Sequence, residues 1–305
     1  MQKFTLRDLL TRFGTVEQCL AFIKEQRWPD EHYGGGIPCK KCERVTPHHM
    51  IPSRKCYSCQ NCGSHVHPTA GTIFERSRVP LPDWFYVIFQ FAKTRAGFSA
   101  KQVERELGVS YPTALRMCNL IRSQLGESPT LSGIVEADET YIGGKPRIRG
   151  VSKRGRGTRK VPVIGAVQRD GKIVVKAVDN VKRETVIPWL KEHIKEGAEV
   201  YTDELNIYDV LPEEGYEHEK VLHKQRQYAR ITEDGKNVHT NHLEGFWSYP
   251  KSAVLRIHRG VSRRKLQGYL NEHAFRYNHR KDADGLFCAM LTRASSEVAP
   301  LAQAR

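Results

Sequence analysis

Three acidic residues have the types and positions that a two-metal phosphoryl-transfer site requires: Asp138, Asp203 and Glu244. The two aspartates each follow a short apolar run that predicts a β-strand, and Glu244 opens a stretch that predicts a helix. Two divalent ions held between such carboxylates can activate an attacking oxygen and stabilise the leaving oxygen. The pattern therefore predicts an enzyme acting on nucleic-acid phosphates with two Mg²⁺ ions, for which Mn²⁺ can substitute.

Four further polar residues lie near these acids in the sequence. Strand alternation places Glu136 on the same face as the first aspartate, where it could assist, and Glu139 on the opposite face. Asn241 is either a helix cap or an amide-oxygen ligand that could replace the third acid. Lys251 follows Glu244 by two helical turns, so it either reaches a phosphate near the metals or is a solvated surface lysine.

A cysteine pattern typical of a structural zinc site occupies the N-terminal third. Cys39 and Cys42 form one C-x-x-C pair and Cys59 and Cys62 form another, with 16 residues between the pairs. That length suits a β-hairpin that brings four thiolates to one tetrahedral Zn²⁺. Cys56 forms an alternative C-x-x-C with Cys59, but we favour Cys59 and Cys62 as ligands. One of the nearby histidines could replace a cysteine, but four cysteines already fill the ligand shell. The isolated cysteines are predicted to be small core residues: Cys19, Cys118 and Cys288.

Residues 97–123 have the pattern of a helix-turn-helix. Ser99 with Gln102 forms a capping box, Gly108 suits the turn, and Ser110 can cap a second helix. This second helix would present three side chains to a DNA groove: Tyr111, Thr113 and Arg116. The alternative is an ordinary helical hairpin in a core.

The charge of the chain also favours a nucleic-acid partner. The 49 Lys and Arg exceed the 34 Asp and Glu, giving a formal net charge of +15, which suits binding to a polyanion. Eight basic residues and no acid lie in 145–160, and eight against one acid lie in 256–281. No run of 18 apolar residues or signal-peptide core occurs, so we expect no membrane partner and a cytoplasmic, nucleoid-associated protein.

The elements around these residues predict several domains. Residues 1–36 form a helical segment in which Gly14 can split one helix into two, 37–75 a zinc ribbon and 80–126 the helix-turn-helix region. Strands near 134–138, 161–167, 173–178, 199–202 and 216–222, a helix at 184–195 and a long helical region at 241–280 follow. We therefore predict an α/β, ribonuclease-H-like (integrase-type) catalytic domain over 130–282, with 145–160 as a mobile basic loop and 283–305 as a C-terminal tail.

Several strings occur in one order that resembles a known family. They include the two cysteine pairs, Asp138-Glu-Thr-Tyr-Ile-Gly-Gly-Lys145, Tyr201-Thr-Asp203 and Asn241-x-x-Glu244-x-Phe-Trp-Ser248. Together they resemble the zinc-ribbon DDE transposases of bacterial insertion sequences, the ISXO-like group or insertion-sequence 1595 family, over about residues 5–280. The resemblance implies that Asp138, Asp203 and Glu244 are the catalytic triad and that the paired cysteines bind zinc.

The resemblance further implies cleavage at transposon ends and transfer of the new 3′-OH into target DNA, by a multimer on paired ends. One departure is Trp247-Ser-Tyr-Pro-Lys-Ser252, in which Pro250 removes a helix hydrogen bond and should kink or restart the helix. Two alternatives stay open. A ribonuclease-H-like nuclease would share the metal site without joining strands, and a zinc-dependent DNA-binding regulator would use only the N-terminal region.

Overall fold

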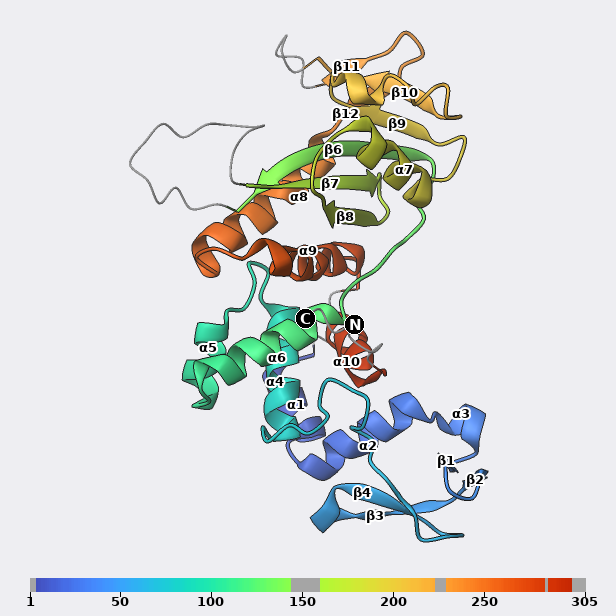
Figure 1. Cartoon of the computed structure of the whole chain (residues 1–305), viewed down its shortest axis with the longest axis vertical. Coiled ribbons are helices and arrows are strands. Elements are labelled where there is room, and N and C mark those ends of the chain that lie inside the picture. The colour runs from blue at the N-terminus through green and yellow to red at the C-terminus, as the bar shows by residue number, and fades with distance from the viewer. Residues whose placement is uncertain (1–3, 144–159, 223–228, 283–284, 298–305) are drawn as a thin grey trace. The chain divides into compact units, whose positions relative to one another are not determined.

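The computed structural model describes residues 4–143, 160–222, 229–282 and 285–297, and these form two compact units (Figure 1). Met1–Gln124 and Asp282–Arg305 belong to the first unit, and Leu125–Lys281 to the second. The predicted basic loop at 145–160 lies, apart from Lys160, outside the described residues. Among the described helices, none is long and apolar enough to cross a membrane.

Helices and short strands build the first unit. Its helices are α1 (Leu6–Phe13), α2 (Val16–Arg27), α3 (Asp30–Tyr33), α4 (Leu81–Lys93), α5 (Ala100–Leu107), α6 (Tyr111–Ser123) and α10 (Gly285–Ser295). Gly14 does end α1, and capping boxes from Thr5 and Thr15 begin α1 and α2. The aromatic ring of Phe13 contacts those of Phe85 and Phe287 in the core of this unit.

Helix α10 lies in the segment predicted as a C-terminal tail, 283–305. In the structure, Leu286, Phe287, Met290 and Leu291 are buried, and the helix packs on α2 and α4. Cys288, predicted to be a core residue, is instead exposed because it lies on the opposite side of this helix. Cys19 and Cys118 are buried as predicted.

Short antiparallel strands connect α3 to α4. They are β1 (Ile37–Cys39), β2 (Arg44–Thr46), β3 (His48–Ile51), β4 (Cys56–Cys59) and β5 (His65–Val66). Strand β1 pairs with β2, and β4 pairs with both β3 and β5. The predicted hairpin between the two cysteine pairs is therefore present as β3 and β4.

Helices α5 and α6 form the predicted helix pair. Both hydrogen bonds of the Ser99–Gln102 capping box are present, and Gly108 adopts the left-handed conformation (φ +65°) that glycine favours. Ala114, Met117, Cys118 and Ile121 form the buried side of α6. The local chemistry read from the sequence therefore predicts both helices and their turn.

A five-stranded mixed sheet forms the centre of the second unit. Its strands are β6 (Ile134–Ile142), β7 (Val161–Gln168), β8 (Ile173–Ala177), β9 (Glu199–Thr202) and β10 (Glu217–Lys220), in the order β10-β9-β6-β7-β8. The β6–β9 and β9–β10 pairs are parallel, whereas β6–β7 and β7–β8 are antiparallel. Asp170, at φ +56°, forms part of the predicted turn between β7 and β8.

Helices lie against the apolar side chains of this sheet. Val135 and Ala137 of β6 belong to one core cluster with Ile187 and Leu190 of α7 (Arg183–His193). A second cluster contains Leu243, Phe246 and Trp247 of α8 (Asn241–Ser252) and Leu266 and Leu270 of α9 (Arg263–Asn278). A separate antiparallel pair, β11 (Ala229–Ile231) and β12 (Asn237–His239), precedes α8.

The region predicted as one long helical stretch at 241–280 is divided in the structure. Helix α8 passes into a π-helical turn at Ala253–Ile257, and α9 begins six residues after that turn ends. Arg259 and Gly260 both have positive φ, and the Gly260 N–H donates back to the Val254 carbonyl. This left-handed turn ends the helical path and lets α9 pack along β8.

Candidate active site and metal centre

The three predicted acids lie on three different elements of the second unit. Asp138 is within β6, the central strand, and Asp203 directly follows β9, the parallel neighbour of β6. Glu244 lies in the first turn of α8, which packs on β6 and β7. The sheet order therefore places the two aspartates on adjacent strands, and α8 supplies the third carboxylate.

The surroundings of the partly buried Asp138 carboxyl group disfavour its charged form. Burial, followed by the nearby charges of Glu139 and Asp203, raises its pKa to about 8 from an ordinary value of 3.8. A divalent cation would relieve this repulsion, so the donor set fits a hard metal ion held by oxygen ligands.

Trp247 also contacts the first aspartate. Its indole Nε1 donates to Asp138 Oδ2 at 3.0 Å, and the hydrogen bond opposes the rise in pKa. Gly165 of β7 lies directly opposite Asp138 across the strand pair. The indole ring packs against Gly165 so closely that a Cβ there would lie 2.7 Å from two ring carbons. Trp247 thus packs the helix onto the sheet and also orients a carboxylate.

Lys251 lies near this group although its side chain reaches solvent. Partial burial lowers its pKa, and the repulsion from Lys160 acts in the same direction, whereas Asp138 and Glu244 act in the opposite one. Two cations and two carboxylates thus lie near one another at this place in the second unit.

Pro250 does not restart the helix where the sequence suggested. Helix α8 continues through Pro250 to Ser252, and the change to a π-helical turn follows at Ala253. Asn241 is the first helical residue, so the cap position falls to Thr240, whose side chain makes no capping hydrogen bond.

Two sets of potential metal ligands within the described residues have all donor atoms within 4.8 Å of one another. They are the four cysteines Cys39, Cys42, Cys59 and Cys62, and the set Glu136, His239 and His242. Asp138, Asp203 and Glu244 do not form such a set. Ligands that hold two ions about 3.5–4 Å apart surround a larger volume than the ligands of a single ion. A wider spacing of these three carboxylates is therefore compatible with a two-metal site.

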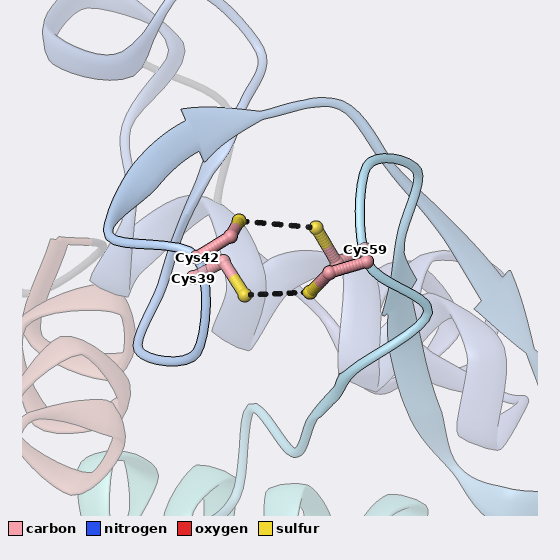
Figure 2. A group of neighbouring side chains, drawn as sticks. Cys39, Cys42 and Cys59 are labelled. Atoms are coloured by element: carbon pink, nitrogen blue, oxygen red, sulfur yellow. Dashed lines mark hydrogen bonds between the residues drawn. The ribbon is translucent and has the colours of Figure 1, made fainter.

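The four cysteines converge with the geometry of a tetrahedral site. Figure 2 shows the sulfur atoms of Cys39 and Cys42 on one side of the site and that of Cys59 facing them from the other. The Sγ of Cys39 lies 3.5 Å from that of Cys62, and the Sγ of Cys42 lies 3.8 Å from that of Cys59. A tetrahedron with Zn–S bonds of about 2.3 Å has edges of about 3.8 Å. The thiol positions therefore fit one structural zinc ion.

The surroundings of Cys59 favour its thiolate form, whereas burial and hydrogen bonds with the other three cysteines raise the pKa of Cys62 to about 11. The Thr46 hydroxyl lies 3.1 Å from Cys59 Sγ and is the largest cause that lowers the pKa of this thiol to about 6. Cys56 is buried at the start of β4 and lies outside the four-thiol set, as do the nearby histidines. The structure thus brings together the cysteines that the sequence analysis preferred.

The side chains expected to contact DNA lie on the outer side of α6. Tyr111 and Arg116 are exposed, and Thr113 is partly exposed. The Lys101 ammonium lies over the Tyr111 ring, 4.7 Å from its centroid. The Thr113 and Ser110 hydroxyl groups lie 2.9 Å apart at the start of the helix.

Two contacts around the acids had no signal in the sequence. The buried Tyr208 hydroxyl donates to Glu139 at 2.9 Å. Burial, followed by the charges of Glu139, Asp138 and Asp203, raises the pKa of this phenol. Arg169, read only as part of a turn, pairs with the fully buried Glu136. Both contacts join residues far apart in the chain, so local spacing could not reveal them.

Known proteins were compared with this chain. Residues 130–278 match the family described as ISXO2-like transposase domain. The chain is 31% identical over 281 residues to the "Uncharacterized protein in transposable element ISH50" of Halobacterium salinarum, which covers 87% of this chain and 91% of that protein. It is 27% identical over 108 residues to an "Uncharacterized transposase-like protein" of Haemophilus influenzae, over 35% of this chain and 82% of that protein.

Proposed function

This chain belongs to the ISXO2-like transposases of the insertion-sequence 1595 family, and we propose that it cleaves DNA at the ends of its element and joins the 3′-OH to target DNA. The observation that carries this proposal is the grouping of acids on β6, after β9 and on α8 with Lys251 beside them. A DNA-binding regulator would have no use for that grouping.

The second unit supplies the groups for phosphoryl transfer. Asp138, Asp203 and Glu244 would hold two Mg²⁺, and Asn241 is the fallback ligand. When bound, the ions activate the attacking oxygen and stabilise the leaving oxygen. The Trp247 N–H orients Asp138 by donating to Oδ2. Lys251 would neutralise charge on the phosphate and hold the strand in position for in-line attack.

The sheet supports a ribonuclease-H-like assignment. Numbered in chain order, the five strands are arranged 3-2-1-4-5, and the second strand is antiparallel to its two neighbours, the first and the third. The first strand then carries the first acid, the fourth strand precedes the second acid, and the following helix carries the third.

Recognition of the element's ends is proposed for the first unit. Tyr111, Thr113 and Arg116 on α6 would contact the DNA groove, with the four-cysteine zinc site stabilising the neighbouring hairpins. The basic segment at 256–281 would contact phosphates, and we expect a homo-oligomer on paired ends.

An in vitro strand-transfer assay tests the proposal. Purified protein, Mg²⁺ and a duplex carrying the ends of its own element should produce joined products, and Asp203→Asn should abolish them. Asp209→Asn is a matched control, because Asp209 lies nearby in the same unit but pairs at the surface with Lys220. Cleavage without joining favours the ribonuclease-H-like nuclease, and end binding unchanged by Asp203→Asn favours the regulator.

A further inference from the structure

Glu136 is a buried carboxylate whose two oxygens both accept hydrogen bonds. Oε1 accepts from Arg169 Nε at 3.0 Å and lies 2.8 Å from His242 Nδ1 and 3.1 Å from His239 Nδ1. Oε2 accepts the main-chain N–H of His242 at 2.9 Å and that of Leu243 at 3.3 Å. One carboxylate on β6 therefore satisfies the donors at the start of α8 that the cap residue Thr240 leaves without a side-chain acceptor.

Arg169 extends these contacts to the segment that leads into α8. Its Nη1 donates to the Asn237 carbonyl at 2.8 Å and its Nη2 to the His239 carbonyl at 3.2 Å. A guanidinium presents several donors in a fixed plane, so one side chain can hold two carbonyl groups of β12 and a carboxylate of β6 at once. The position of β12 relative to β6 is set in this way, with only Thr240 between β12 and α8.

The same guanidinium contacts the strand that precedes Asp203. It lies over the Tyr201 ring, 4.7 Å from its centroid, and Tyr201 is two residues before Asp203 on β9. Glu136 is two residues before Asp138 on the same face of β6, and Leu243 directly precedes Glu244. The Glu136–Arg169 pair thus touches each of the three elements that carry the proposed metal ligands.

We infer that Glu136 and Arg169 are positioning residues that set the spacing of Asp138, Asp203 and Glu244 and thereby the affinity for the catalytic metal ions. The inference rests on the proposed function. Removing one partner of a buried ion pair is destabilising, because the other charge is then buried without compensation. Groups that orient metal ligands typically change metal affinity or activity by about 10–100-fold when they are altered.

A direct metal site at Glu136, His239 and His242 is the competing explanation. Their donor atoms lie close enough to surround an ion. However, Arg169 already places a cation 3.0 Å from the oxygen that both rings face, and a metal there would add a second cation to the same oxygen. The contacts therefore favour hydrogen bonding over metal binding.

The test measures Mn²⁺ affinity of the zinc-loaded, full-length protein from the electron paramagnetic resonance signal of free Mn²⁺. Glu136→Gln should raise the dissociation constant about 10–100-fold. Arg169→Lys should also raise the dissociation constant, because a lysine cannot make the other contacts of the guanidinium. The lysine keeps a positive charge beside Glu136, which favours folding of this variant. Glu272→Gln is the matched control: Glu272 is also fully buried and pairs with Arg276 in the same unit.

The outcomes are distinguishable. A higher dissociation constant in Arg169→Lys, with Glu272→Gln unchanged despite any loss of stability, supports positioning. Wild-type affinity in Arg169→Lys, together with weakened binding in Asp203→Asn, overturns this inference but leaves the proposed function standing. Unchanged binding in Asp203→Asn overturns both. A second zinc equivalent that is lost in His242→Ala but kept in Asp203→Asn would identify a direct metal site and overturn positioning.

Discussion

The close contact between Gly165 and Trp247 predicts what a single methyl group added at position 165 would do to stability and activity. In Gly165→Ala, the new Cβ would lie 2.7 Å from two carbons of the Trp247 ring and 3.2 Å from Leu243 Cδ1. Non-bonded carbon atoms prefer about 3.5–4.0 Å, so the ring must move by roughly 1 Å. The same ring donates the 3.0 Å hydrogen bond to Asp138, and the movement will therefore disturb both the core and the candidate active site.

The magnitude follows from two opposing effects. Overpacking of a core costs about 1–3 kcal/mol, and replacing glycine lowers the entropy of the unfolded chain, which offsets about 0.4–1 kcal/mol. A net loss of about 1–2 kcal/mol would lower the melting temperature of the second unit by about 2–8 °C. Because a misplacement of about 1 Å can cost on the order of 100-fold in rate, we expect cleavage to fall at least about tenfold.

Calorimetry and the cleavage assay measure these two effects on the same preparation. Gly245→Ala is the control, because a Cβ at this position on α8 meets no atom within 4 Å and alanine is favoured over glycine in helices by about 0.5–1 kcal/mol. The control should melt at or above the wild-type temperature. If Gly165→Ala also melts there and cleaves at the wild-type rate, the ring does not occupy the position described and the argument for Trp247 fails.

Three further predictions concern other parts of the chain. Asp138 has a folded pKa of about 8 against an ordinary value of 3.8, so its own contribution to the stability of the metal-free protein should be fully present below about pH 4 and be lost as pH rises toward 8; Mg²⁺ or Asp138→Asn should flatten this part of the pH dependence in thermal melts. Cys59→Ser should abolish zinc binding in metal analysis and destabilise the first unit, whereas Cys56→Ser should keep the zinc. Arg116→Ala should weaken binding to the element's ends, measured by fluorescence anisotropy. If the Arg116 side chain contacts a phosphate, the substitution should also reduce the salt dependence of the affinity. An unchanged affinity would favour the alternative that α5 and α6 are an ordinary helical hairpin in a core.

Much of the fold could be predicted because its signals are local. The Ser99–Gln102 capping box, the Gly108 turn and the apolar runs of β7 and β8 each depend on residues a few positions apart. The boundaries between α8 and α9 were predicted less well, because the positive φ values at Arg259 and Gly260 interrupt an otherwise helical pattern. The docking of α10 in the first unit also had no local signal, since an apolar helix face does not specify its partner.

The identity of the candidate chemical groups was readable from the sequence, and their surroundings were not. Two C-x-x-C pairs specify soft ligands in number and kind, and acids after predicted strands specify hard ligands, whatever the details of packing. The Trp247–Asp138 hydrogen bond joins residues 109 positions apart, and the contact of His242 with Glu136 spans 106. Such contacts depend on strand order, register and the angle of α8. These arise only when the whole sheet is assembled, because sequence periodicity reveals which face a side chain occupies but not what it meets there.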